Sequence, residues 1–90
     1  MSEWRVEFHG KSENDLSNLD RSIRRRIIDR VEWLSKNFDG ITPIPLSGEW
    51  RGFFKLRMGD WRIIYTINEK EKLVAIHYID NRAKVYKRRK

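Results

Sequence analysis

The chain has 90 residues, 39% of them hydrophobic and 37% charged, which fits a single globular domain spanning residues 1–90. It contains no Cys, and this excludes disulfides, thiolate catalysis and Cys-ligated metal centres. The 20 Lys and Arg residues against 13 Asp and Glu give a formal net charge of +7, which indicates a polyanionic partner, either nucleic acid or an acidic protein.

The first part of the chain predicts one strand and two helices. Apolar and polar residues alternate over Trp4–His9, the period of a half-buried strand. Ser12 with Asp15 three residues later resembles a capping box and opens a short helix. Asp20 can cap a longer helix that forms a hairpin with the first one. The apolar stripe of this longer helix consists of Ile23, Ile27, Val31, Leu34 and Phe38.

The second part of the chain predicts strands. Two prolines and a glycine make Ile41–Gly48 a loop, after which the hydrophobic period changes to two. Strands are predicted over Trp50–Met58, Trp61–Ile67 and Leu73–Ile79, with a tight Gly-Asp turn between the first two. Arg82–Tyr86 fits either a short strand or a turn.

The predicted order is therefore β-α-α-β-β-β, an α+β fold. Consecutive hairpins make the last three strands antiparallel, and the helical hairpin should cover one face of the sheet. The other face is then left for polar and charged side chains.

The positive charge lies almost entirely in the second half. Residues 1–50 hold 8 basic and 9 acidic side chains, a net charge of −1, whereas residues 51–90 hold 12 basic and 4 acidic ones, a net charge of +8. An anion-binding surface is therefore expected on the predicted strands and the C-terminal segment.

Four cations are predicted on the sheet face away from the helices: Arg51, Lys55, Arg57 and Arg62. Lys and Arg most often lie on a solvated strand face. However, like charges on neighbouring strands destabilise a sheet unless an anion lies among them, and no Asp or Glu is predicted on this face. The pattern therefore favours an anion-binding site.

A longer motif runs from Leu46 to Tyr65 and reads LSGEWRGFFKLRMGDWRIIY. It resembles the central signature of the RelE/ParE toxin superfamily, which reads roughly L-x-G and then G-x-[FY]-R/K-L-R-x-G-D-[YW]-R-[IV]-[IV]-Y. The similarity continues through Ile79–Arg82 and ends with Val85 and Tyr86, like the family's G-H-R-x-x-V-Y. It covers roughly residues 4–86.

The resemblance implies a type II toxin of the RelE branch, an endoribonuclease that cuts mRNA in the ribosomal A site by attack of the 2′-OH on the adjacent phosphate. By the same resemblance Lys55, Arg57 and Arg62 occupy catalytic or phosphate-binding positions, as do Arg82 and Tyr86. Clustered cations suit this reaction because negative charge builds on the phosphate oxygens.

Each of these residues can be given a role. Arg62, assisted by Arg57, would stabilise the developing charge. Lys55 is the candidate general base, activated by the neighbouring guanidinium groups. Arg82 would hold the phosphate or the leaving 5′-oxygen, and Tyr86 would stack on or orient the nucleotide.

The sequence departs from the family pattern at two positions. Phe53 stands where a second lysine is expected, and Arg51 is the candidate phosphate-binding residue that compensates for it. Asn81 replaces the His of the C-terminal motif. The two histidines, His9 and His77, lie on predicted strands and are interpreted as structural residues.

Two other functions stay open. The same fold carries ParE-like inhibitors of DNA gyrase without nuclease activity, and a basic binding module without activity is a third reading. Lys55 together with the Arg82 and Tyr86 ending favours the nuclease, because ParE-type chains usually lack the terminal Val-Tyr.

The expected partners are a separate acidic, RelB-like antitoxin, the ribosome and mRNA, and no cofactor or metal is expected. Apolar runs of only a few residues cannot span a membrane, and the N-terminus lacks the pattern of a signal peptide. We therefore expect a soluble cytoplasmic protein.

Overall fold

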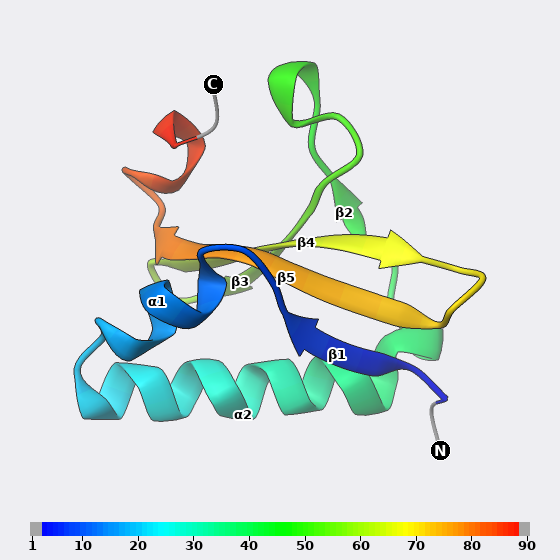
Figure 1. Cartoon of the computed structure of the whole chain (residues 1–90), viewed down its shortest axis with the longest axis horizontal. Helices are drawn as coiled ribbons and strands as arrows, with labels where there is room; N and C mark the ends of the chain where they lie inside the picture. Colours follow the sequence, from blue (N-terminus) through cyan, green and yellow to red (C-terminus); the bar gives the residue numbers. More distant parts are fainter. Residues whose placement is uncertain (1–2, 89–90) are drawn as a thin grey trace.

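The computed structural model describes residues 3–88 and contains one five-stranded sheet with two helices on one side (Figure 1). The strands are β1 (Arg5–Phe8), β2 (Ile44–Pro45), β3 (Phe54–Met58), β4 (Trp61–Asn68) and β5 (Leu73–Asn81). The helices are α1 (Ser12–Ser17) and α2 (Arg21–Asn37), and short 3-10 turns cover Phe38–Gly40, Gly48–Trp50 and Val85–Lys87. The predicted α+β fold is confirmed.

The sheet has the strand order β1-β5-β4-β3-β2. β1 pairs in parallel with β5, whereas β2, β3, β4 and β5 pair with their neighbours in antiparallel fashion. The predicted antiparallel arrangement of the last three long strands is therefore correct. The parallel pairing of β1 places the first strand next to the last, so that β5 lies inside the sheet.

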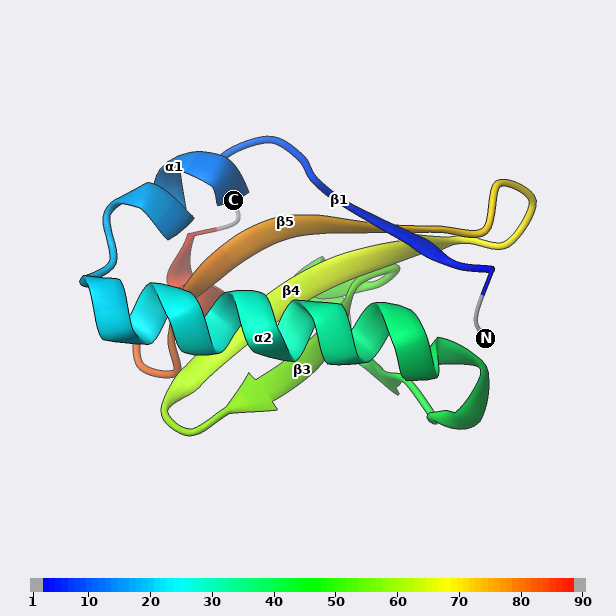
Figure 2. The same ribbon diagram turned by 90° about the horizontal axis from the view of Figure 1, so that it is seen from below.

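The main core lies between α2 and the sheet, and Figure 2 shows α2 running across this face. Ile27, Val31 and Leu34 of the predicted stripe are buried there. They pack with the side chains of alternate strand residues Leu56, Ile63, Tyr65, Val74 and Ile76. Burying these apolar side chains stabilises the fold and fixes which face of each strand points away from the helices.

The predicted start of the long helix is confirmed. The Asp20 carboxylate accepts a hydrogen bond of 3.0 Å from the backbone N–H of Ile23, which is the N-cap interaction. This hydrogen bond lowers the pKa of Asp20 below its usual value.

The predicted capping box of the short helix is wrong. Lys11 occupies the N-cap position of α1 and makes no capping hydrogen bond through its side chain. The Ser12 hydroxyl donates instead to the carbonyl of His9, at 2.7 Å. Asp15 accepts a 2.9 Å hydrogen bond from the backbone N–H of Ile79 in β5. This tertiary hydrogen bond ties α1 to the sheet.

A second, smaller core lies on the opposite face of the sheet. Trp50, Ile64 and Val85 are buried there, and Leu46, Phe53 and Tyr78 pack around them. Figure 1 shows the two segments that supply Trp50 and Val85, coloured green and red, on the side of the sheet away from α2. The face predicted to carry cations is therefore partly covered by apolar side chains.

The sequence misplaced several strand boundaries. The predicted loop over Ile41–Gly48 contains the two-residue strand β2, which pairs with β3. The strand predicted from Trp50 begins only at Phe54, because Gly48–Trp50 forms a 3-10 turn and Gly52 has a φ of 95°, outside the extended region. Arg82–Tyr86, for which a strand or a turn was predicted, leads by a turn into a 3-10 helix.

Candidate active site

Two rows of side chains cross the sheet on the face away from α2. In the first row Arg57 of β3 lies directly opposite Arg62 of β4. In the second row Lys55 lies opposite Ile64, which is buried under Trp50 and Val85. Side chains directly opposite each other have Cβ atoms about 5 Å apart, so Arg57 and Arg62 are held as a pair of like charges.

The tight turn between β3 and β4 brings a third cation to this end of the sheet. The Arg62 guanidinium donates to the carbonyls of Gly59 and Trp61, at 2.9 and 3.0 Å. The backbone N–H of Arg82 donates to the carbonyl of Asp60 at 2.8 Å, and the Nε of Arg82 lies 3.8 Å from the Asp60 carboxylate. Arg62 and Arg82 therefore flank the same turn although they are 20 positions apart in the sequence.

The prediction that this face carries no carboxylate is wrong. Asp80 lies directly opposite Arg62 in the register of β4 and β5. The sequence missed it because β5 was predicted to end at Ile79, whereas it continues to Asn81. The Asp80 carboxylate lies 3.3 Å from the guanidinium of Arg88, so its charge is shared with a cation of the C-terminal segment.

Tyr86 lies in the 3-10 turn that follows β5. Its side chain is half-exposed and meets the Trp50 ring edge-on, with the ring centroids 6.0 Å apart. The Trp50 indole N–H donates to the carbonyl of Tyr86 at 3.4 Å. Together with Leu46, Ser47 and Glu49, these two aromatic residues line a hollow of about 440 Å³. A hollow with an aromatic wall can accept a planar base.

Asn81, which stands in place of the family's His, shapes this C-terminal turn. Its side-chain oxygen accepts hydrogen bonds from the backbone N–H groups of Ala83 and Lys84, at 3.0 and 3.1 Å. This is the local side-chain to backbone pattern by which Asn redirects a chain. Asn81 therefore turns the chain from β5 toward Tyr86.

Arg51 lies apart from the two rows. It is exposed and follows the Gly48–Trp50 turn, before β3 begins, so that the predicted alternation along one strand does not position it. The structure thus brings Arg57, Arg62 and Arg82 to one end of the sheet, with Lys55 one row away.

The two histidines make structural contacts. His9 is hydrogen-bonded to Glu7 at 2.9 Å and His77 to Thr66 at 2.9 Å, and the two rings lie 5.9 Å apart. Among residues 3–88, no three side chains of the His, Asp and Glu types gather to hold a metal ion. Neither α1 nor α2 is long and apolar enough to cross a membrane, and this holds for the whole described part of the chain.

A five-stranded sheet with one long helix across it is also the fold of solved RelE toxins. The model of the family described as ParE toxin of type II toxin–antitoxin system, parDE, matches residues 6–86, so the chain belongs to this family of the RelE/ParE superfamily. The predicted resemblance is confirmed, and the chain is a type II toxin–antitoxin toxin.

Similar proteins support this assignment. The structure of the toxin–antitoxin complex RelBE2 from Mycobacterium tuberculosis contains a chain that is 28% identical, with a TM-score of 0.78, covering 88% of this chain and 98% of that one. Toxin RelG of M. tuberculosis (strain ATCC 25618 / H37Rv) is 39% identical over 44 residues. That match covers 49% of this chain and 51% of RelG, so the chain spans about half the length of this curated relative.

The isolated E. coli RelE toxin shares the fold, with a TM-score of 0.71 over 93% of this chain and 92% of that one. Its sequence identity of 15% supports nothing beyond the fold.

Proposed function

We propose that this toxin is a ribosome-dependent mRNA endonuclease that cleaves in the A site without a catalytic metal. The observation that supports this function best is the convergence of Arg57, Arg62 and Arg82 at the turn between β3 and β4. Three guanidinium groups at one edge can surround a phosphate, which accepts paired N–H donors.

The proposed reaction breaks the P–O5′ bond. Lys55 takes the proton of the ribose 2′-OH, and the 2′-oxygen attacks the adjacent phosphorus. The 5′-oxygen then leaves and takes up a proton from water, so that the products carry a 2′,3′-cyclic phosphate and a 5′-OH. Arg62 and Arg57 stabilise the charge that grows on the non-bridging oxygens, and Arg82 holds the phosphate or the leaving oxygen.

The aromatic side of the site would hold the nucleotide. The half-exposed ring of Tyr86 can stack on a base or orient it. Arg51, exposed next to the Gly48–Trp50 turn, would bind a neighbouring phosphate of the same strand.

The test is a cell-free translation reaction with a reporter mRNA and mapping of the cut sites. Arg62→Ala and Arg82→Ala should each lower the single-turnover cleavage rate by roughly 10²–10³-fold, the scale of removing one transition-state charge stabiliser. Arg25→Ala, which removes an exposed cation of α2 on the other side of the sheet, is the matched control. A wild-type rate for either active-site variant would overturn the site assignment.

Two further measurements define the chemistry. Tyr86→Phe separates stacking from hydroxyl chemistry, because retained activity leaves Tyr86 with stacking alone. Ribosomes need Mg²⁺, so the metal test removes only trace zinc and manganese from assembled ribosome complexes. Loss of cleavage after that removal would contradict metal-independent chemistry.

A ParE-like inhibitor of DNA gyrase is the second candidate, because the matching family is described by its ParE toxins. A DNA supercoiling assay tests it with the same preparation of protein. Inhibition of supercoiling together with intact mRNA would favour this function over the nuclease.

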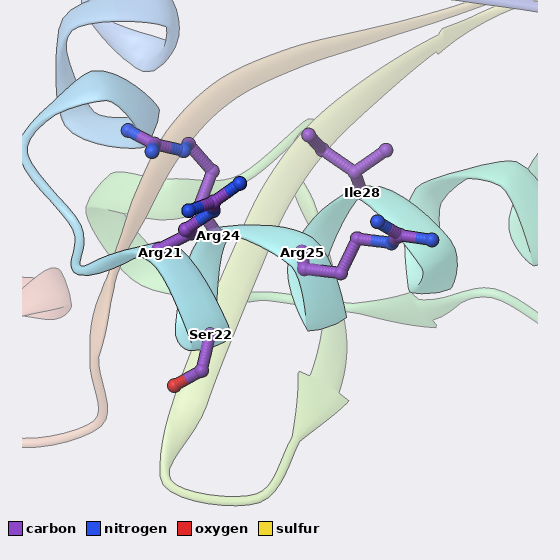
Figure 3. Close-up of a pocket in the computed structure, with 5 residues that line it drawn as sticks. All are labelled: Arg21, Ser22, Arg24, Arg25 and Ile28. Atoms are coloured by element: carbon purple, nitrogen blue, oxygen red, sulfur yellow. The ribbon is translucent and has the colours of Figure 1, made fainter.

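We also propose that an acidic, RelB-like antitoxin binds this protein, since a similar solved structure is a toxin–antitoxin complex. Besides Lys55, Arg57 and Arg62 on the sheet face away from α2, which we call the cation rows, the structure has a second basic cluster near the start of α2. A hollow of about 510 Å³ is lined by Arg21, Arg24 and Arg25 together with Ile28, and Figure 3 shows these side chains on the first turns of the helix. Sequence analysis overlooked this cluster because residues 1–50 carry no net positive charge.

The surroundings of this hollow suit an amphipathic partner helix. Ile28 also lines a neighbouring groove with Val6, Phe8 and Val31, between α2 and β1. A helix with apolar side chains in the groove and acidic ones near the arginines would bind in the usual helix-in-groove mode.

Co-expression of the neighbouring acidic reading frame should restore growth to cells that express the toxin. Arg24→Glu should slow the association of the purified proteins, and the difference should shrink in high salt. Failure of every neighbouring product to restore growth would contradict the antitoxin proposal.

A further inference from the structure

The C-terminal segment ends in a cluster that ties it to two other elements. The Arg88 guanidinium lies 2.8 Å from the carboxylate of Asp15 in α1 and 3.3 Å from that of Asp80 in β5. It also lies over the Tyr78 ring, 4.9 Å from the ring centroid. We call Arg88, Asp15, Asp80 and Tyr78 the Arg88 clamp.

The clamp is shielded from solvent. The side chains of Arg88, Asp15 and Asp80 are 21%, 11% and 25% exposed, whereas the Arg25–Asp29 and Arg82–Asp60 pairs join side chains that are at least 63% exposed. Fully exposed pairs contribute little to stability, but hydrogen-bonded charges that are partly buried bind more strongly. In agreement, the hydrogen bond that Arg88 donates to the Asp15 carboxylate raises the pKa of Arg88.

The clamp holds one end of the segment that carries Tyr86. At the other end, Asn81 fixes the turn after β5. Between these two points Val85 is fully buried in the second core, and the carbonyl of Tyr86 accepts a hydrogen bond from Trp50. Without Arg88 the segment that carries Tyr86 would lose its ties to α1 and β5, and the hydrogen bond from Trp50 and the burial of Val85 would have to hold it.

Arg88 differs from the other cations of this face in one respect. Its charge is balanced by two carboxylates at hydrogen-bonding distance, so it is poorly suited to bind a further anion. Its hydrogen bonds join three elements: the C-terminal turn, α1 and β5.

We propose that Arg88 is a positioning residue that fixes Tyr86 against Trp50, and that it acts on the reaction only through Tyr86. This inference rests on the proposed nuclease function. In this proposal Asp15 and Asp80 hold the C-terminal segment in place by binding the Arg88 guanidinium.

The first test is a double-mutant cycle on the single-turnover cleavage rate at saturating protein. Arg88→Ala should lower the maximal rate by roughly tenfold, as expected when a catalytic group is misplaced by about 1 Å or less. In a Tyr86→Ala background, Arg88→Ala should lower the rate no further. Arg88→Lys, which keeps the charge but not the two-carboxylate geometry, should recover part of the rate.

Lys87→Ala is the matched control, because it removes one positive charge from the same turn at an exposed side chain outside the clamp. Its maximal rate should stay within about twofold of wild type. The proposal would be overturned if the rate losses of Arg88→Ala and Tyr86→Ala multiplied in the double variant, or if Lys87→Ala lost as much rate as Arg88→Ala. Either result would indicate that the charge of Arg88 acts directly on the RNA.

The second test does not depend on cleavage. Hydrogen exchange of the Trp50 indole N–H, followed by NMR, reports on its hydrogen bond to Tyr86. Arg88→Ala and Arg88→Lys should speed this exchange, and Lys87→Ala should not. The backbone amide of Ile63, in the main core, should keep wild-type protection in all three variants, which separates local release from unfolding.

If the wild-type protein cleaves no mRNA, the nuclease proposal fails. The exchange measurement alone then tests whether the Arg88 clamp holds the backbone of Tyr86 in place. Unchanged indole exchange in Arg88→Ala would overturn the clamp, whatever the enzymatic activity of the protein.

Discussion

The pair formed by Arg57 and Arg62 predicts that one substitution raises stability while it lowers activity. The two residues lie directly opposite each other on β3 and β4. The side chain of Arg57 is exposed, and the hydrogen bond that Arg30 makes with this residue goes to its backbone carbonyl at 3.4 Å. Arg57→Gln therefore removes a charge and leaves this backbone hydrogen bond in place.

The size of the effect follows from the spacing of the charges. Two like charges about 7 Å apart in a watery environment repel by about 0.6 kcal/mol. Measured cross-strand pairs differ by about 0.2–1 kcal/mol, in the same range. We expect Arg57→Gln to raise the free energy of unfolding by about 0.5 kcal/mol at low salt, and to lower the single-turnover cleavage rate by roughly tenfold or more through the loss of a phosphate contact.

The assay is urea unfolding at low and at high NaCl concentration, because urea adds no ions. Exposed charges are screened over about 10 Å at 0.1 M salt and over about 3 Å at 1 M, so the gain should vanish in 1 M NaCl. It should also vanish in an Arg62→Gln background, where the repelling partner is gone. Arg51→Gln, outside the strand register, is the control for general charge effects.

Two results would refute this reasoning. One is a loss of stability in Arg57→Gln at low salt, which would mean that an anionic group such as Asp80 already compensates the pair. The other is a gain that persists at high salt, which would point to a packing effect and not to repulsion.

Two further predictions concern stability. Val85→Ala should lower the free energy of unfolding by about 2 kcal/mol in urea titrations, because this fully buried side chain closes the second core; a loss below about 0.5 kcal/mol would contradict that role. Burial raises the pKa of Tyr65 to about 12 from an ordinary value of 10.0. The unfolded chain therefore loses the Tyr65 proton at a lower pH than the folded protein does. The free energy of unfolding should fall by up to about 2–3 kcal/mol as the pH rises from about 10 to 12. Tyr65→Phe should remove this part of the alkaline loss, and an unchanged pH profile would contradict it.

Much of the fold could be predicted because local chemistry and tertiary structure agree there. Asp20 caps α2, and the apolar stripe of this helix faces the sheet. Predictions failed where a local pattern had a competing tertiary use. Asp15 was assigned to a cap, but it accepts a hydrogen bond from β5 instead. The strand period around Trp50 could not reveal the positive φ of Gly52, which interrupts the extended chain.

The candidate site was predictable only in part. The pairing of Arg57 with Arg62 follows from strand alternation and a two-residue turn, both readable in the sequence. Arg88 lies 73 positions from its partner Asp15, and no periodicity connects such distant residues. The same holds for the contact between Trp50 and Tyr86, which are 36 positions apart.

The two faces of the sheet differ in how firmly they hold their side chains. The face against α2 is secured by a core of a dozen buried residues, whereas the opposite face holds the C-terminal segment through Trp50, Ile64 and Val85 together with the Arg88 clamp. Segments with few buried contacts open at a lower free-energy cost than the whole domain unfolds. The segment that carries Tyr86 can therefore leave its position while the sheet and the cation rows stay intact. Because Lys55, Arg57 and Arg62 sit on strands and Tyr86 on this separable segment, phosphate binding by these three cations and nucleotide stacking should respond independently to mutation, and a loss of stacking need not weaken their binding of the RNA backbone.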